Sequence, residues 1–232
     1  SLLFSTTSSC EPSSPAGQRL DREAALLLGT LKETAVDPAS DFDRAANDLM
    51  FDYEQDPRLL LKELTGLLQH ENPSVRYRIA QLFFRCGFES ESAKRTLLAI
   101  ASADEKIPMK IDGDDLDLRI PTVLFLARYR VREVSDTLWK FYTETEERIF
   151  ADELINLRDT RYGDLISTKI STPGQAATHA RAIGEFGLNQ FKEPLVRDYE
   201  ILNYRSSPME TQIIELNWAL YSLTGDAWYL QK

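Results

Sequence analysis

Apolar side chains recur every three or four residues from Leu20 to the end of the chain, and polar residues fill the positions between them. This spacing places the apolar side chains on one face of an α-helix. No run shows the sustained alternation of apolar and polar residues that is typical of a strand. The pattern therefore predicts an all-α protein.

Two helices are expected before the first long repeat of this pattern. One carries an apolar stripe from Leu20 to Leu31 and is closed by Pro38, and another runs from about Asp41 to Tyr53. We interpret residues 19–56 as an N-terminal helical cap. The rest of the domain, residues 57–232, is interpreted as a set of helical hairpins.

The hairpins follow one another at a period of about 30 to 40 residues, which is the signature of an α-solenoid. Their second helices are expected to end near five positions, which are Gly87, Arg130, Thr160, Gly187 and Gly225. The interval before Arg130 is the longest. We interpret the stretch from Asp104 to Asp114 as an insertion between two helices that accounts for it.

Three segments carry a family resemblance. Asn72 to Leu82 reads Asn-Pro-Ser-Val-Arg, followed by Ile-Ala and Leu, and resembles the second helix of a HEAT repeat. Asp117 to Phe125 repeats this shape, and Ala177 to Gly187 matches the later part of the helix. The resemblance implies an α-solenoid, or superhelix, of about five HEAT-like hairpins behind the N-terminal cap.

The HEAT resemblance also carries expectations about function. In HEAT families the second helices line a concave inner surface, and the proteins usually serve as scaffolds or binding partners, although a few are enzymes. Arg76 and Arg119 occupy equivalent places in the two best-matched segments. The resemblance implies that they are structural arginines of the repeat.

Residues 1–18 differ from the rest of the chain. Apolar residues are followed by small ones leading into Cys10, and then by a segment rich in Pro and Ser. That order resembles a bacterial lipoprotein signal with Cys10 as the lipidated residue and residues 1–9 removed. It implies a periplasmic or cell-envelope location, whereas a disordered tail with an incidental cysteine leaves the protein cytoplasmic.

The amino-acid composition limits the classes of partner and cofactor that the protein can bind. The 232 residues include 27 Lys and Arg against 37 Asp and Glu, giving a net charge of −10, with two Cys and two His. An acidic chain is a poor match for nucleic acid, and two cysteines cannot form a disulfide framework or a four-thiolate zinc site. We expect no cofactor, no nucleic-acid partner, and membrane contact only through lipidated Cys10.

The acidic run from Asp112 to Asp117 is the most conspicuous local feature. An EF-hand loop needs Gly at its sixth position and Glu at its twelfth, but these places hold Asp117 and Val123. We interpret the run as a solvated loop that caps a helix. Loose Ca²⁺ binding through Asp112 and Asp114 is the alternative.

Catalytic motifs are not evident in the sequence. It has no Gly-x-Ser-x-Gly elbow and no Gly-rich phosphate loop, and Cys86 lies on an apolar stripe where a thiol is inert. We therefore expect a non-catalytic protein. An enzyme that uses carboxylates for acid–base chemistry is an alternative.

Aromatic and arginine side chains on the predicted second helices are typical anchors of protein recognition. We predict a scaffold or adaptor that binds a protein or peptide on the concave face; a toxin-neutralising immunity protein or inhibitor is a narrower alternative. The predicted partner-binding residues are Arg78, Arg85, Phe125, Arg128, Glu185 and Tyr221.

Overall fold

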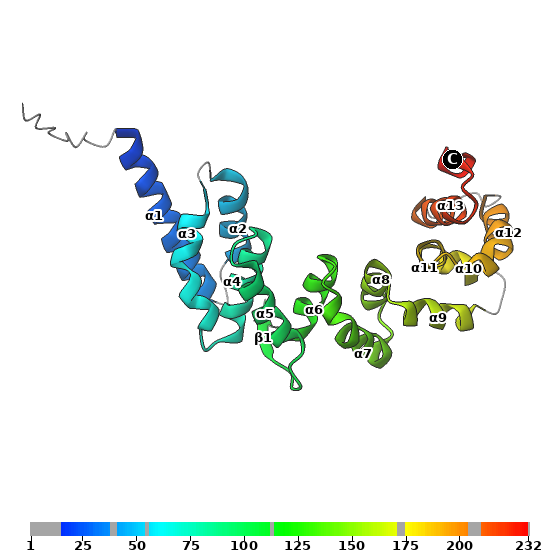
Figure 1. Cartoon of the computed structure of the whole chain (residues 1–232), viewed down its shortest axis with the longest axis horizontal. Helices are drawn as coiled ribbons and strands as arrows, with labels where there is room; N and C mark the ends of the chain where they lie inside the picture. Colours follow the sequence, from blue (N-terminus) through cyan, green and yellow to red (C-terminus); the bar gives the residue numbers. More distant parts are fainter. Residues whose placement is uncertain are drawn as a thin grey trace, which may run out of the picture. The chain divides into compact units, whose positions relative to one another are not determined.

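The computed structural model describes residues 15–37, 41–53, 56–111, 114–170, 175–203 and 210–231. Within these residues the chain is all-α, apart from one short hairpin, and helices that follow one another in sequence pack together (Figure 1). The prediction of an all-α protein is therefore confirmed. The sequential packing is compatible with a helical repeat.

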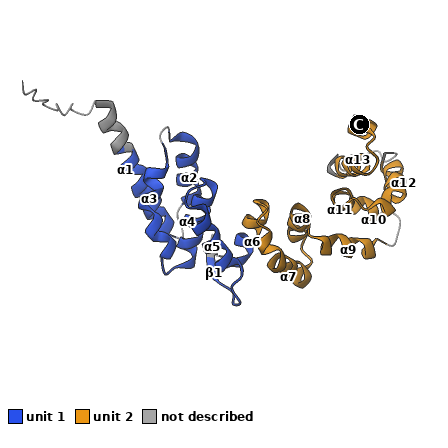
Figure 2. Cartoon of the chain, in the orientation of Figure 1, with its two compact units in different colours: residues 1–122 blue, residues 123–232 orange. Residues whose placement is uncertain are grey.

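The chain divides into two compact units, residues 1–122 and 123–232 (Figure 2). The boundary lies inside α6 (Arg119–Arg128), so each unit contains part of this helix. We describe the two units separately. Cys10 and Asp112 lie outside the described residues, and so does the side chain of Asp114.

Unit 1 begins with the helices expected from the sequence. Its elements before α6 are α1 (Pro15–Val36), α2 (Phe42–Asn47), the π-helix η1 (Asp48–Asp52), α3 (Arg58–Glu63), the 3-10 helix η2 (Thr65–Gln69), α4 (Pro73–Arg85), α5 (Ser90–Ala101), β1 (Pro108–Ile111) and β2 (Asp114–Asp117). Helix α1 packs against α2, α3 and α4, and α4 packs against α5.

Helix α4 shows how the sequence sets an element. Asn72 caps it by accepting a hydrogen bond from the amide of Ser74 at 2.9 Å, and Pro73 occupies the first turn. Val75, Ile79 and Phe83 are spaced by four residues and are fully buried. This buried stripe holds α4 at the centre of unit 1.

The predicted insertion is partly a β-hairpin and not only a loop. Strands β1 and β2 pair antiparallel, with Met109 opposite Leu116. Met109 is buried against Ile100 and Leu118, and this contact anchors the hairpin. The interpretation of the acidic run as a loop is wrong for Asp114–Asp117, which form β2, because four residues are too few to show a clear alternation. Asp117 does cap the next helix, since its Oδ1 accepts a hydrogen bond from the amide of Arg119 at 3.1 Å. Asp112-Gly113, between the strands, is a common hairpin signal.

Unit 2 continues with short helices joined by tight connections. After α6 its elements are the 3-10 helix η3 (Arg132–Val134), α7 (Ser135–Thr145), α8 (Arg148–Leu157), α9 (Thr160–Lys169), α10 (Gln175–Thr178), α11 (Ala180–Phe186), the 3-10 helix η4 (Asn189–Phe191), α12 (Lys192–Asn203), α13 (Glu210–Thr224) and the 3-10 helix η5 (Ala227–Leu230).

Helices α8, α11 and α13 form successive contacts within unit 2, and α7 and α9 pack on α8. The closest approach is at Gly184 of α11, where an added Cβ would lie 2.6 Å from the ring of Trp218. Only glycine permits this spacing between α11 and α13. The buried core below includes Phe150, Leu154 and Ile183.

Candidate functional site: an arginine cavity in unit 2

The arginines predicted to be structural do support the fold of unit 1. Arg76 donates from Nη1 to the carbonyls of His70 at 2.7 Å and Glu71 at 2.9 Å. Arg119 donates to the carbonyls of Ala103 at 3.0 Å and Asp104 at 3.2 Å. Each side chain fixes the connection that precedes its own helix.

Two predicted partner-binding residues of unit 1 also make internal contacts. Arg78 is half-buried, and its Nη1 donates to carbonyls at the end of α1, at 2.8 Å to Thr34 and 2.7 Å to Asp37. Burial lowers the pKa of Arg78, although Asp43 and Asp37 oppose the shift. Arg85 donates to Asn47 Oδ1 at 3.2 Å.

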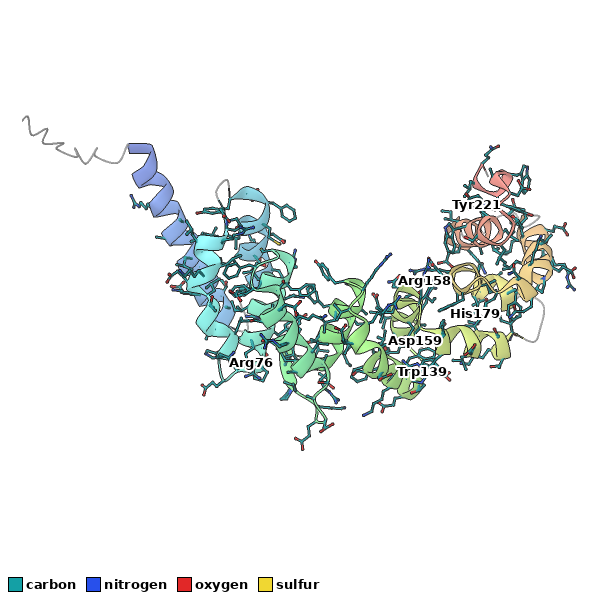
Figure 3. The ribbon with its side chains drawn as sticks, viewed as in Figure 1. Arg76, Trp139, Arg158, Asp159, His179 and Tyr221 are labelled. Atoms are coloured by element: carbon teal, nitrogen blue, oxygen red, sulfur yellow. The ribbon has the colours of Figure 1, made fainter. Side chains whose placement is uncertain are left out.

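The other four predicted residues lie in unit 2. Phe125 is half-buried on α6, and the side chain of Arg128 is 63% exposed while Nε donates to Glu153 at 3.1 Å. Glu185 lies on α11, and Tyr221 lies exposed on α13 (Figure 3). Arg128 and Glu185 both border the polar region described next.

Four helices end with the same backbone geometry. In each, a residue in the left-handed region donates its amide to the carbonyl three residues earlier, and the next amide donates to the carbonyl five residues earlier, at 2.8 to 3.3 Å. This pattern is the Schellman motif. The four left-handed residues are Gly87, Arg130, Arg158 and Gly187, with φ of 64°, 59°, 54° and 62°.

The predicted helix ends at Gly87, Arg130 and Gly187 agree with these motifs, but the end expected near Thr160 lies at Arg158. Asp159 explains the difference, because its Oδ1 accepts a hydrogen bond from the amide of Arg161 at 3.0 Å and starts α9 at Thr160. An arginine at the helix end gives no sequence signal comparable to glycine.

Arginine is an unusual residue in the left-handed region, because its Cβ lies too close to the backbone there. This steric conflict costs roughly 1 to 2 kcal/mol of conformational free energy relative to glycine. Two of the four motifs nevertheless use it. Arg130 follows α6 and Arg158 follows α8. A backbone outlier of this kind is a reason to look for function at the same place.

Arg130 and Arg158 line one cavity of about 310 Å³. The lining of this arginine cavity comprises Arg130, Arg132, Ile155, Asn156, Leu157, Arg158 and Glu185. The lining thus carries three guanidinium groups and one carboxylate, and Glu185 Oε2 lies 3.3 Å from Arg158 Nη2. Figure 3 shows Arg158 at the end of α8.

The charge of the cavity is not balanced from within. In the described part of the chain, neither Arg130 nor Arg132 has a side-chain hydrogen bond or ion pair, and both are exposed. The protein as a whole carries a net charge of −10. A local surplus of cations against this background creates a field that attracts anionic groups.

A polar network holds Asn156, one of the residues that line the cavity. The carboxylate of Glu153 is buried, and its Oε2 accepts a hydrogen bond from Asn156 Nδ2 at 2.8 Å. Asn156 Oδ1 accepts one from Arg181 Nη2 of α11 at 2.7 Å. Both side-chain atoms of Asn156 are thereby held, so α8 and α11 present a rigid wall to the cavity.

An aromatic pair adjoins the cavity. The rings of Phe125 and Tyr129 lie with centroids 4.8 Å apart, and Tyr129 is 49% exposed. Tyr129 directly precedes Arg130 in the chain. Phe125, Arg128 and Tyr129 share one face of the end of α6, by their helical spacing.

A second charged cluster in unit 2 is structural. Asp159 accepts hydrogen bonds from Arg161 Nη2 at 2.6 Å and from the hydroxyl of Ser135. Arg161 also lies over the ring of Trp139 at 5.3 Å, and Figure 3 shows Trp139 and Asp159 near each other. This cluster joins α7 to the start of α9.

Cys86 of unit 1 and His179 of unit 2 have shifted pKa values. Burial raises the pKa of the half-buried Cys86 thiol, and burial together with Lys169 lowers the pKa of His179. Among the described residues no group of three or more His, Cys, Asp or Glu is placed to hold a metal ion. No helix in the described ranges has the length and apolar content needed to cross a membrane.

Arg130, Arg132 and Arg158 were not among the predicted site residues. The spacing of three or four residues tells which side chains share a face within a helix. These arginines follow helix ends, where the chain leaves the helix and the spacing no longer applies. The available signal was the presence of Arg at two helix ends where two comparable helix ends have Gly. Protein-family models, curated proteins and solved structures yield no match to this chain.

Proposed function

We propose that the protein is a non-catalytic binding module that holds an acidic segment of a protein partner in the arginine cavity. The observation that carries this proposal is the placement of Arg130 and Arg158. Both occupy left-handed positions that glycine fills in equivalent motifs, and both line the same cavity. The unfavourable backbone position is then offset by a favourable contact with an anion.

The chemistry of the lining suits carboxylates. A guanidinium presents several N–H donors in a planar fork that matches a carboxylate, and charge-assisted hydrogen bonds of this kind are strong. A volume of about 310 Å³ is at the lower end of the range for ligand sites. Two or three acidic side chains of a peptide therefore suit the cavity better than a large ligand does.

The fold supports binding by a rigid surface. We propose a HEAT-like solenoid, and the recurrence of one helix-end geometry at four helices supports this reading. In such a stack each hairpin is held by its neighbours. A partner then binds with little ordering of the module, which favours affinity.

A defined peptide tests the proposal. Fluorescein-labelled hexaglutamate is titrated with the protein, and binding is followed by fluorescence anisotropy, with hexaglutamine as the uncharged comparison. We expect binding of hexaglutamate only, weakened by added salt. The double variant Arg130→Gly/Arg158→Gly should bind at least about tenfold more weakly, which corresponds to about 1.4 kcal/mol.

A matched control removes two charges elsewhere. The double variant Arg95→Ala/Arg197→Ala has the same change in net charge, and both residues are exposed and outside the cavity lining. Its affinity for hexaglutamate should stay within about twofold of the wild type, since exposed charges that do not contact the ligand are screened by salt. Equal weakening in the two double variants would contradict the proposal.

A further inference from the structure

A partly exposed aromatic pair in unit 2 indicates which type of residue lies next to the acidic residues in the partner segment. Tyr129 is 49% exposed and contacts Phe125 at a centroid distance of 4.8 Å. Arg130, the next residue, lines the cavity. The aromatic pair of Phe125 and Tyr129 thus lies in the same unit as the cavity, and its Tyr129 directly precedes a lining residue in the chain.

This aromatic contact differs from most others in unit 2. Phe141 and Phe150 stack within the core, and Tyr142 meets Tyr162 edge to face with both rings at least nine-tenths buried. Those rings stabilise the packing of helices. Tyr129 instead keeps half of its surface in solvent, between Arg128 and Arg130 in the chain. Tyr and Arg, with Trp, are the residues enriched among binding hot spots.

Arg128 links the two parts of this surface. It lies between Phe125 and Tyr129 in the chain, and Glu153 fixes its guanidinium at 3.1 Å while 63% of the side chain remains exposed. A held guanidinium can pack flat against an aromatic ring of a partner. The end of α6 therefore offers an apolar platform with a cationic edge.

We infer that the partner segment carries an aromatic residue next to its acidic residues, with the ring on Phe125 and Tyr129 and the carboxylates in the arginine cavity. This inference rests on the proposed function, because it assigns the partner chemistry of the same site. Aromatic contacts contribute beyond simple burial. The aromatic residue should therefore supply selectivity among acidic segments.

Four labelled peptides test the inference with the full chain. They are hexaglutamate, hexaglutamate followed by Trp, hexaglutamate preceded by Trp, and hexaglutamate followed by Ala. We expect at least one Trp peptide to bind about five- to tenfold more tightly than hexaglutamate, in line with the strength of aromatic pairs. The Ala peptide should bind like hexaglutamate.

Variants assign this gain to the aromatic pair. Tyr129→Ala should remove the advantage of the Trp peptide and leave the affinity for hexaglutamate within about twofold of the wild type, while Tyr129→Phe should retain the advantage. Tyr221→Ala, at another exposed tyrosine of unit 2, is the control and should also retain it.

The outcomes separate the two proposals. If hexaglutamate binds but both Trp peptides bind no better than the Ala peptide, the aromatic inference is overturned and the arginine cavity stands. A Trp advantage that survives in Tyr129→Ala also overturns the inference. If no acidic peptide binds, the proposed function fails and the inference fails with it.

Discussion

Arginines of the two units differ in what their guanidinium groups contact. In unit 1, Arg76, Arg78 and Arg119 donate to backbone carbonyls at distances from 2.7 to 3.3 Å. In unit 2, Arg130 and Arg132 face a cavity and have no such partner among the described residues. The same side chain therefore serves the fold in one region and is available to a ligand in the other.

The comparison shows that residue type alone does not identify a binding arginine. A guanidinium that donates to backbone carbonyls at a helix end supplies hydrogen bonds that those carbonyls cannot form within the helix. One that lacks a partner keeps its donors for an anion. Arg161 of unit 2 is also structural, although its partners are the carboxylates of Asp159 and Asp136 and not backbone carbonyls. The contacts, and not the unit, define the two kinds.

The largest effect on stability is expected for Arg119→Ala. The side chains of Arg119 and Asp117 are only 11% and 9% exposed, and Arg119 Nη2 lies 2.7 Å from Asp117 Oδ2. Removal of Arg119 leaves a buried carboxylate without its partner, so we expect unfolding free energy to fall by about 3 kcal/mol. Urea unfolding followed by far-UV circular dichroism measures this loss.

Arg132→Ala is the control for the urea unfolding of Arg119→Ala. Arg132 is exposed at the cavity, and its replacement should change the unfolding free energy by no more than about 0.5 kcal/mol. Equal losses for Arg119→Ala and Arg132→Ala would break the division between structural and cavity arginines.

A smaller effect is expected for Asp159→Asn, which tests Arg161 as the structural arginine of unit 2. Burial alone would raise the pKa of Asp159, but hydrogen bonds from Arg161 and Ser135 outweigh burial and hold that pKa below its ordinary value. Ionised Asp159 therefore stabilises the fold above about pH 4, and this contribution is lost as the pH falls through the lowered pKa.

The variant should lose about 2 kcal/mol at about pH 7, since hydrogen bonds to a charged group are removed. The difference from the wild type should shrink as the pH falls through the lowered pKa of Asp159, where the carboxylate becomes protonated. All three tryptophans lie in unit 2, so fluorescence during urea unfolding reports on this unit. Asp164→Asn, at an exposed position of α9, should show no such pH dependence.

Much of the fold could be predicted because it depends on local rules. Asn72-Pro73 starts α4 and Gly87 follows its end, as the capping and glycine signals indicate. The hairpin of β1 and β2 was missed, since its anchor Met109 is buried by a tertiary contact with Leu118 that no local pattern reveals. The packing of α11 on α13 at Gly184 was not foreseen for the same reason.

Only one lining residue of the cavity was among the predicted residues. Glu185, chosen from its helix face, lines the cavity, whereas Phe125 and Arg128 lie on α6, which ends just before Arg130. The lining arginines were not chosen, because the chain turns away from the helix at Arg130 and Arg158. Arg78 was chosen from its helix face, but its hydrogen bonds to the end of α1 depend on how α1 packs on α4.

The smallest effect on unfolding free energy is expected for substitutions of the left-handed residues at helix ends of unit 2. These substitutions also test most directly whether Arg158 is a cavity arginine or a structural one. Arg158→Gly should leave the unfolding free energy unchanged or raise it by up to about 1 kcal/mol, because glycine relieves the crowded backbone. Gly187→Ala should lower it by about 1 kcal/mol; an added Cβ meets no atom within 4 Å, so backbone strain alone is measured.

The same Arg158→Gly protein should bind hexaglutamate more weakly, although it is at least as stable as the wild type. Stability and binding then move in opposite directions, as expected when an unfavourable backbone position is retained for a ligand contact. Tryptophan fluorescence in urea and peptide anisotropy measure the two properties on one sample. A loss of more than about 1 kcal/mol in Arg158→Gly would instead place Arg158 with the structural arginines, through its ion pair with Glu185.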